Sequence, residues 1–305
     1  MALNLKVFPC YFKPRIKRAG KQQANILPGR TNTGIDVKLK KVIALAALLV
    51  LIPLSAPAEQ KLNYWPYQEK NLSVSAEYFQ WKEYLKDGTE LLSESGPRWG
   101  LGIREHNYGR RLYGVVYEID MRLYFGTVNY DGKSQDGSGN FFNVNTKTDY
   151  KGGRLLVMGG QRLTHPSLDM LAGMEVNSWI RSLIGATDSG GNYASGYHEM
   201  YRVLTARAAL GTLQTFAGKP VYIQGGAKYP LDIFEYATVD TVRLTPKPAL
   251  AFFGSVDIMK FWPSTLVKGS LKVFYEGYRF NASEVVNNYY QPESRMDTVG
   301  ISLQF

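Results

Sequence analysis

Cysteine and histidine are scarce in this chain of 305 residues. Its one cysteine is Cys10, and its three histidines are His106, His165 and His198. A single cysteine excludes an internal disulfide and a thiolate metal cluster. Three histidines that lie far apart in the sequence give no metal-ligand spacing and no legible Ser–His–acid constellation. We therefore predict no metal site, no cofactor and no identifiable catalytic residue.

Long apolar runs are also lacking, and the longest stretch lies near the start of the chain. It covers residues 42–54, whereas a membrane-spanning helix needs about 20 apolar residues. Three lysines precede it, and Ala56 and Ala58 follow it as an Ala-x-Ala cleavage site. This order is typical of a secretory signal peptide, which we place at residues 37–58. Residues 1–36 are then interpreted as an upstream extension that does not belong to the natural protein.

Charge of one sign is in excess only in this leader. The whole chain carries a formal net charge of +10, but ten of its 36 basic residues and one of its 26 acidic residues precede Glu59. The remainder holds 26 basic and 25 acidic residues and is nearly neutral. A nearly neutral chain has no electrostatic footprint for nucleic acid, so we predict no nucleic-acid partner.

The rest of the chain alternates between apolar and polar residues with a period of two. In residues 111–128, Ile119 and Leu123 share one face of an extended strand, whereas Glu118 and Arg122 share the other. A strand of this length can cross a bilayer, which takes roughly 9 to 11 tilted residues. Segments of this kind predict ten strands, at residues 71–83, 98–107, 111–128, 150–163, 168–181, 197–213, 220–230, 248–261, 266–280 and 296–305.

The gaps between these strands are long and short in strict alternation. Short turns are expected near residues 108–110, 164–166, 215–218 and 262–264, and long polar loops at residues 84–97, 129–149, 182–196, 231–247 and 281–294. This rhythm is typical of a membrane barrel, whose loops are long on one side and short on the other. The sequence predicts an all-β, closed antiparallel up-and-down transmembrane barrel of about ten strands, with eight or twelve as alternatives. The barrel spans residues 71–305, after a periplasmic segment at residues 59–70.

The end of the chain carries a motif of its own. Thr298, Gly300, Leu303 and Phe305 follow a polar-x-Gly-x-x-apolar-x-aromatic pattern that stops on the last residue. This pattern resembles the terminal assembly signal of Gram-negative outer-membrane β-barrels. The resemblance implies recognition by the barrel-assembly machinery and a place in the cell outer membrane, with both termini in the periplasm. It also implies contact with outer-membrane lipid and lipopolysaccharide.

The inward strand faces carry charges of both signs in rough balance. At about this strand number the interior is just filled by side chains, and mixed charge argues against strong ion selectivity. A salt-bridged filling is therefore favoured over a narrow solute pathway. The expected members of this lumen charge network are Glu77, Arg104, Glu118, Asp120, Arg122, Glu175, Arg181, Arg207, Lys272 and Glu276. Aromatic side chains near strand ends are expected to form interfacial girdles: Trp81, Trp99, Tyr130, Trp179, Tyr197, Tyr229, Phe261, Trp262 and Tyr278.

Three functional classes follow from this architecture. The favoured one is a structural or surface-interaction barrel, whose long outer loops meet an unknown extracellular ligand. A narrow solute channel is the alternative, and an omptin-like rim hydrolase is the third. A rim enzyme would have to use His198, with a partner such as Asp149 or Asp188.

Overall fold

The computed structural model describes residues 6–7, 68–108, 114–135, 140–164, 168–238, 241–261, 269–287 and 289–305. The upstream extension, apart from residues 6–7, lies outside these residues. So do the signal peptide, its cleavage site at Ala56 and Ala58, and most of the 59–70 segment. No helix among the described residues is long and apolar enough to cross a membrane.

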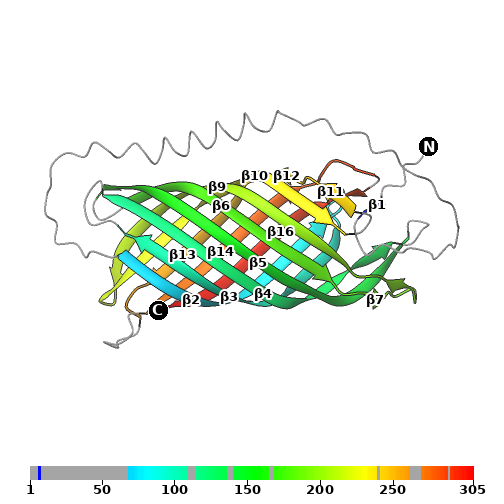
Figure 1. Ribbon diagram of the computed structural model, residues 1–305, viewed down its shortest axis with the longest axis horizontal. Helices are drawn as coiled ribbons and strands as arrows, with labels where there is room; N and C mark the ends of the chain where they lie inside the picture. Colours follow the sequence, from blue (N-terminus) through cyan, green and yellow to red (C-terminus); the bar gives the residue numbers. More distant parts are fainter. Residues whose placement is uncertain are drawn as a thin grey trace.

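Ten long strands form the wall of the molecule (Figure 1). They are β2 (Gln68–Tyr84), β3 (Glu90–Asn107), β4 (Val115–Gln135), β5 (Phe141–Thr164), β6 (Leu168–Leu183), β9 (Tyr197–Phe216), β10 (Lys219–Ala237), β13 (Ala251–Ile258), β14 (Ser270–Asn281) and β16 (Glu293–Gln304). Six short strands accompany them: β1 (Lys6–Val7), β7 (Ala186–Thr187), β8 (Tyr193–Ala194), β11 (Val242–Leu244), β12 (Lys247–Pro248) and β15 (Tyr289–Tyr290).

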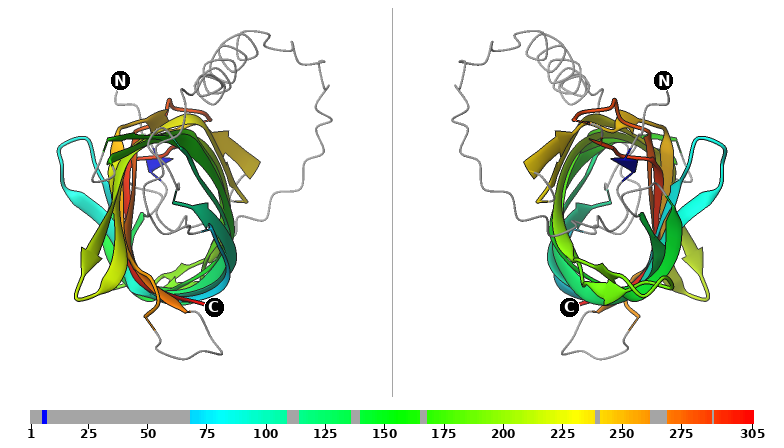
Figure 2. Two further views of the ribbon diagram at one scale, coloured as in Figure 1. Left: turned by 90° about the vertical axis from the view of Figure 1, so that its left-hand side faces the viewer. Right: turned by 90° about the vertical axis from the view of Figure 1, so that its right-hand side faces the viewer.

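The long strands close into a ring, as the end views in Figure 2 show. Each pairs antiparallel with its neighbours in the order β2-β3-β4-β5-β6-β9-β10-β13-β14-β16, and β16 pairs back onto β2. Closure matters because an unpaired backbone group in hydrocarbon costs several kcal/mol, and a closed ring leaves no sheet edge. The predicted closed ten-stranded antiparallel barrel is confirmed. We call the end that holds Phe305 the terminal end and the opposite end, which holds β7 and β11, the distal end.

The outer face of the wall is an apolar belt. Along β4, Met121, Leu123 and Phe125 are exposed, whereas Arg122 and Tyr124 between them are buried. The same alternation runs around the ring, which is the pattern of strands that face lipid on one side and the lumen on the other. Other exposed members of the belt include Leu72, Val74, Leu101, Ile103, Leu155, Val157, Met170, Val176, Leu210, Ile223, Phe252, Val273, Val299 and Ile301.

The predicted distal loops at 84–97 and 129–149 are wrong in extent, because the strands continue through them, whereas those at 182–196 and 281–294 do lie between long strands. β3 starts at Glu90 and β4 ends at Gln135, so most of the expected loops at 84–97 and 129–149 belong to the wall. The physical reason is that a strand that has left the hydrocarbon no longer needs an apolar outer face. The hydrogen-bonded ladder continues beyond the point where apolar residues stop alternating with polar ones. The polar ends of the strands were therefore predicted to be loops.

The predicted aromatic girdles are wrong for five of the nine side chains. Trp81, Tyr130, Trp179, Tyr197 and Tyr278 are buried inside the barrel. Trp99 and Tyr229 do face outward, and Trp262 lies outside the described residues. Strand parity explains the difference: Trp81 is three residues from the outward Tyr78, so the two side chains lie on opposite faces.

Candidate functional site

The barrel lumen is the candidate site, and three layers of side chains fill it. We call them the base layer at the terminal end, the charge layer in the middle and the aromatic layer toward the distal end. Each layer is built by inward residues of several strands, since every second residue of each strand points into the lumen.

The base layer is an aromatic plug under the charges. The His106 ring stacks on the Tyr108 ring with 3.8 Å between centroids, and the Tyr222 ring meets His106 edge-on at 5.0 Å. Tyr108 and Tyr222 also pack with Leu213 and Met259 in one buried cluster. Beside them Arg162 pairs with Asp169 at 2.8 Å and donates to the Tyr108 carbonyl. These contacts occupy the lumen where a pathway would have to leave at the terminal end.

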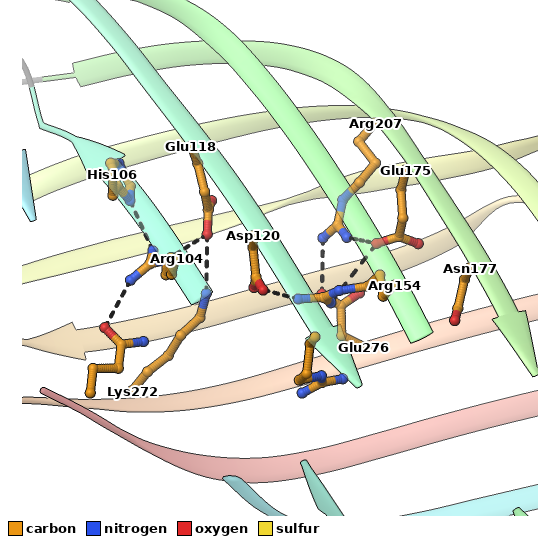
Figure 3. Close-up of polar contacts among 12 residues, drawn as sticks. Arg104, His106, Glu118, Asp120, Arg154, Glu175, Asn177, Arg207, Lys272 and Glu276 are labelled. Atoms are coloured by element: carbon orange, nitrogen blue, oxygen red, sulfur yellow. Dashed lines mark hydrogen bonds and ion pairs between the residues drawn. The ribbon is translucent and has the colours of Figure 1, made fainter. Parts of the chain in front are cut away.

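The lower part of the charge layer centres on Arg104 (Figure 3). Its guanidinium donates to Glu118 and to Asp257, both at 2.9 Å. It also lies 2.8 Å from Nδ1 of His106, which links the two layers. Lys272 reaches the same Glu118 oxygen at 3.2 Å.

The upper part of the charge layer centres on Glu276 (Figure 3). This carboxylate accepts from Arg154 at 2.8 Å, from Arg207 at 3.1 Å and from Lys228 at 2.8 Å. Arg154 also donates to Asp120 at 2.6 Å, and Arg207 pairs with Glu175. One carboxylate thus ties three cations, from three different strands, across the lumen.

A further ion-paired group lies between β2, β3 and β4. Glu77 accepts from Arg98 at 2.9 Å and lies 3.3 Å from Arg122. The Arg98 guanidinium also lies 4.0 Å from the centroid of the Phe79 ring and 4.6 Å from that of Tyr124. Contacts between a guanidinium and an aromatic face are attractive, and more so where water is excluded.

The aromatic layer packs around the ion pairs of Arg181. Arg181 pairs with Glu94 at 2.7 Å and with Glu199 at 2.6 Å, and it lies 3.7 Å from Glu83. Around these groups pack Phe79, Trp81, Tyr124, Tyr130, Tyr150, Trp179, Tyr201, Tyr278 and Phe280. The Trp179 and Tyr201 rings are stacked at 4.9 Å. This layer closes the lumen below the distal end.

All ten residues expected in the lumen network are buried. Ion pairs bring nine of them into the charge layer and the group around Glu77. The tenth, Arg181, lies in the aromatic layer, where it pairs with Glu94. Sequence reasoning missed several equally buried members: Glu83, Glu94, Arg98, Arg154, Glu199, Lys228, Glu235 and Asp257. Glu94 was hidden in an expected loop, and Arg154 in a strand that is apolar on both faces. Extending the inward parity of each strand would have found all of them except Glu235, which lies beyond the bulge in β10.

Little space remains between these side chains. A cavity of about 30 Å³ lies in the charge layer, lined by Arg104, Glu118, Arg122, Arg207 and Glu276 among others. A water molecule needs at least 10–15 Å³ of such volume, so this cavity has room for about two waters. The cavity does not approach the size of a solute pathway.

The distal histidine faces away from the lumen. His198 is exposed on the outside of β9, and its Nδ1 lies 2.8 Å from Ser182 Oγ. Its two candidate partners are engaged elsewhere: Asp149 accepts from Thr127 at 2.6 Å, and Asp188 accepts from Ser134 at 2.7 Å. His165 lies outside the described residues. In the described part of the chain, no group of three His, Cys, Asp or Glu side chains could hold a metal ion.

Asp188 organises the β7–β8 hairpin at the distal end. Its Oδ1 accepts from the backbone N–H groups of Gly190 and Asn192, both at 2.9 Å. Burial alone would raise the pKa of this carboxyl, but the hydrogen bonds from Ser134 and from these backbone groups outweigh it and lower the pKa below its usual value. Such bonds stabilise the ionised form.

Comparisons with known proteins add only similarity of fold. No protein-family model and no curated protein matches the chain. The outer membrane protease OmpT from Escherichia coli is 12% identical over 81% of this chain and 99% of that one, with a TM-score of 0.47. The translocator domain of the autotransporter NalP from Neisseria meningitidis is 11% identical over 88% and 98%, with a TM-score of 0.34. An outer membrane channel from Pseudomonas putida F1 is 12% identical over 81% and 100%, with a TM-score of 0.32.

Proposed function

We propose that this chain is a non-conducting outer-membrane β-barrel that acts as a structural and surface-interaction protein through its distal end. The observation that carries the proposal is the filled lumen. An aromatic plug, a charge layer and an aromatic layer follow one another along the barrel axis, and their members are buried. Because side chains of the barrel itself fill its interior, its outer surfaces are the parts available for contact with other molecules.

The apolar belt supports the membrane location, and the terminal motif supports the outer membrane. Thr298, Gly300, Leu303 and Phe305 lie on β16 or directly after it, at the strand that closes the ring. By resemblance, the barrel-assembly machinery reads this strand and lipopolysaccharide covers the outer leaflet. Both termini of the barrel then lie in the periplasm, and the distal end faces outward.

The distal end carries apolar side chains above the belt, which supports an interaction role. Ile184, just before β7, is 46% exposed, and Tyr193, on β8, is 61% exposed. Val285 is 46% exposed in the segment before β15. Exposed apolar groups on connecting segments are typical of contact surfaces for other molecules. An extracellular ligand would meet these side chains first.

Conductance in planar bilayers tests the proposal. We expect the refolded wild-type protein to give no discrete conductance steps. The matched control is the double variant Trp81→Ala and Trp179→Ala, which removes the two largest side chains of the aromatic layer. The same test on Glu276→Ala asks whether loosening the charge layer opens a path. Reproducible steps from the wild-type protein would favour the narrow-channel alternative.

The rim-hydrolase alternative finds no geometric support at His198. Its ring lies on the outer wall and bonds Ser182, so it does not face a substrate placed over the mouth of the barrel.

A further inference from the structure

The barrel wall has a seam where two neighbouring strands run side by side without pairing. β10 pairs with β13 up to Lys228 and Ala251, and with β11 again from Glu235 and Leu244. Between these points, residues 229–234 and 245–250 are described but form no ladder with each other. We call this stretch the wall seam; it lies beside the labels β10, β11 and β12 in Figure 1.

The sequence of the wall seam explains why the ladder stops. Of its two six-residue stretches, 229–234 contains Pro230, and 245–250 contains Pro246 and Pro248. Proline has no N–H and is excluded from central strands. β10 also carries a bulge on its other side, between Pro230 and Asp232 in its pairing with β9.

Strand parity shows that both strands are irregular here. Lys228 and Glu235 both point inward, although they are an odd number of residues apart, and so do Ala251 and Leu244 on the facing strand. The register on the two sides of the seam is nevertheless the same. The two strands therefore stay opposite each other while their hydrogen bonds are missing.

The outer lip of the wall seam lies at the distal edge of the apolar belt. Tyr229 and Leu250 are 44% and 55% exposed, and the unbroken register places them opposite each other. Phe234 lies just above, under the guanidinium groups of Arg202 and Arg243 at 5.5 and 4.7 Å. In a surrounding bilayer, the outer side of the seam would therefore lie near the boundary between acyl chains and headgroups.

Directly inside the seam is a carboxylate whose oxygens have no hydrogen-bond partner. Glu235 is fully buried, and neither of its oxygens accepts a hydrogen bond. The Tyr201 hydroxyl, which is on the facing position of β9, donates to Glu199 instead, at 3.2 Å. A buried carboxylate without donors is costly and calls for a cation or a donor.

Excess negative charge surrounds Glu235. Two nearby carboxylates, Glu199 and Glu83, already share the Arg181 guanidinium, at 2.6 and 3.7 Å. The cluster of Glu83, Glu94, Glu199 and Glu235 therefore faces a single guanidinium. These carboxylates do not form a metal-ligand group in the part of the chain that the structure describes, which favours an organic cation.

Side chains pack on both sides of Glu235 along the barrel axis. Toward the distal end, Ala237, Val242, Leu244 and Tyr289 form a buried cluster. Below Glu235, Lys228 lies 3.5 Å from the Tyr278 ring and is bound to the charge layer. Glu235 itself borders the wall seam, because its pairing with Leu244 is where the ladder resumes.

We propose that the wall seam is a lateral entrance from the outer leaflet, and that Glu235 binds the ammonium group of an alkyl amine whose chain lies between Tyr229 and Leu250. A primary ammonium supplies both the positive charge and the N–H donors that this carboxylate lacks. An acyl or alkyl chain fits the apolar lip of the seam. The proposal takes the barrel to lie in a bilayer but does not depend on the lumen being non-conducting.

Binding of radiolabelled dodecylamine to the full barrel in nanodiscs tests the site, with empty nanodiscs as background. We expect saturable binding by the wild type and at least a tenfold loss of affinity in Glu235→Gln, which keeps the size of the side chain. Dodecyl sulfate, with the same chain and the opposite charge, should stay at background. Absence of saturable dodecylamine binding, or equal binding by Glu235→Gln, would overturn the proposal.

A reversible cross-link tests the entrance. The variant Tyr229→Cys with Leu250→Cys, made with Cys10→Ser, ties the two lips together when oxidised. We expect the oxidised form to bind dodecylamine at least tenfold more slowly than the same protein after reduction. The control pair is Ile223→Cys with Val256→Cys, two outward residues that face each other in the intact ladder. Equal rates in the oxidised and reduced seam variant would show that the amine does not enter through the wall.

Heat-modifiable gel mobility provides the folding control for every variant. Comparing one variant before and after reduction also removes differences in folding yield. If Glu235→Gln loses binding while the cross-link has no effect, the ammonium site stands and the lateral entrance is wrong. Conductance of the wild-type barrel separately tests its proposed closed lumen, so failure of one does not imply failure of the other.

Discussion

Phe305 and Leu72 exchange two backbone hydrogen bonds at the point where the barrel closes. The Leu72 N–H donates to the Phe305 carbonyl at 3.0 Å, and the Phe305 N–H donates to the Leu72 carbonyl at 2.9 Å. They extend the β16–β2 ladder, which is the ladder that joins the last strand to the first. The last residue of the chain therefore takes part in sealing the ring.

Two changes at Phe305 should separate assembly from closure. Phe305→Ala keeps both backbone hydrogen bonds and removes the ring, whereas deletion removes the bonds as well. We expect both variants to assemble poorly in cells, because both lose the terminal aromatic residue. In detergent refolding, Phe305→Ala should behave like the wild type. Heat-modifiable gel mobility measures both, and normal assembly of Phe305→Ala in cells would contradict the proposed role of the terminal motif.

Glu276 is the position where loss of one side chain should cost most. Glu276→Ala leaves Arg154, Arg207 and Lys228 without their shared partner in a buried layer. Removing one partner of a buried ion pair costs about 3–5 kcal/mol. We expect a loss of this order in the free energy of unfolding, measured by urea titration in lipid vesicles.

The matched control for Glu276 is an exposed pair on the neighbouring strand. Glu293 and Arg295 pair at 2.9 Å with side chains that are 43% and 50% exposed. An exposed pair contributes about 0–1 kcal/mol, so Glu293→Ala should have little effect on unfolding. Equal losses in the two variants would mean that the charge layer is not held by Glu276.

The parts of this structure that could be predicted are those that leave a periodic pattern of apolar and polar residues in the sequence. The strands, their outward faces and the ring followed from alternation, because lipid contact forces every second residue to be apolar. The length of the strands could not be predicted from alternation. Beyond the hydrocarbon the hydrogen-bonded ladder continues, but the outward residues there need not be apolar. Glu94 was lost for this reason.

The lumen was harder to predict than the wall. Which charges are inward follows from parity, but which of them meet depends on contacts across the barrel between strands far apart in the sequence. Arg154 on β5 meets Glu276 on β14, which is 122 positions away in the sequence. The wall seam was invisible to patterning too. Its prolines were in view, but only the register shows that pairing resumes beyond them.

The lipid-facing belt predicts a strong dependence on depth for inserted charge. Leu123 is 63% exposed in the middle of the belt on β4, and Asn129 is exposed on the same face nearer the distal end. An arginine at the bilayer midplane of a barrel costs about 2–4 kcal/mol, falling to about 0–1 kcal/mol near the interface. We expect Leu123→Arg to lower the free energy of unfolding by the larger amount and Asn129→Arg by the smaller. Similar values for the two would place the belt elsewhere.

Asp188 predicts a pH-dependent hairpin at the distal end. Its pKa is lowered in the folded protein by the hydrogen bonds from Ser134 and from the backbone of Gly190 and Asn192. A carboxyl whose folded pKa is depressed stabilises the fold above its unfolded pKa of about 3.9 and loses this effect as the pH falls through the folded pKa. The amide proton shifts of Gly190 and Asn192 should therefore titrate with a midpoint below about 3.9. Asp188→Asn keeps a carbonyl acceptor but has no charge to lose, so its amide shifts should not titrate. A midpoint above the unfolded value in the wild type would show that burial outweighs the hydrogen bonds.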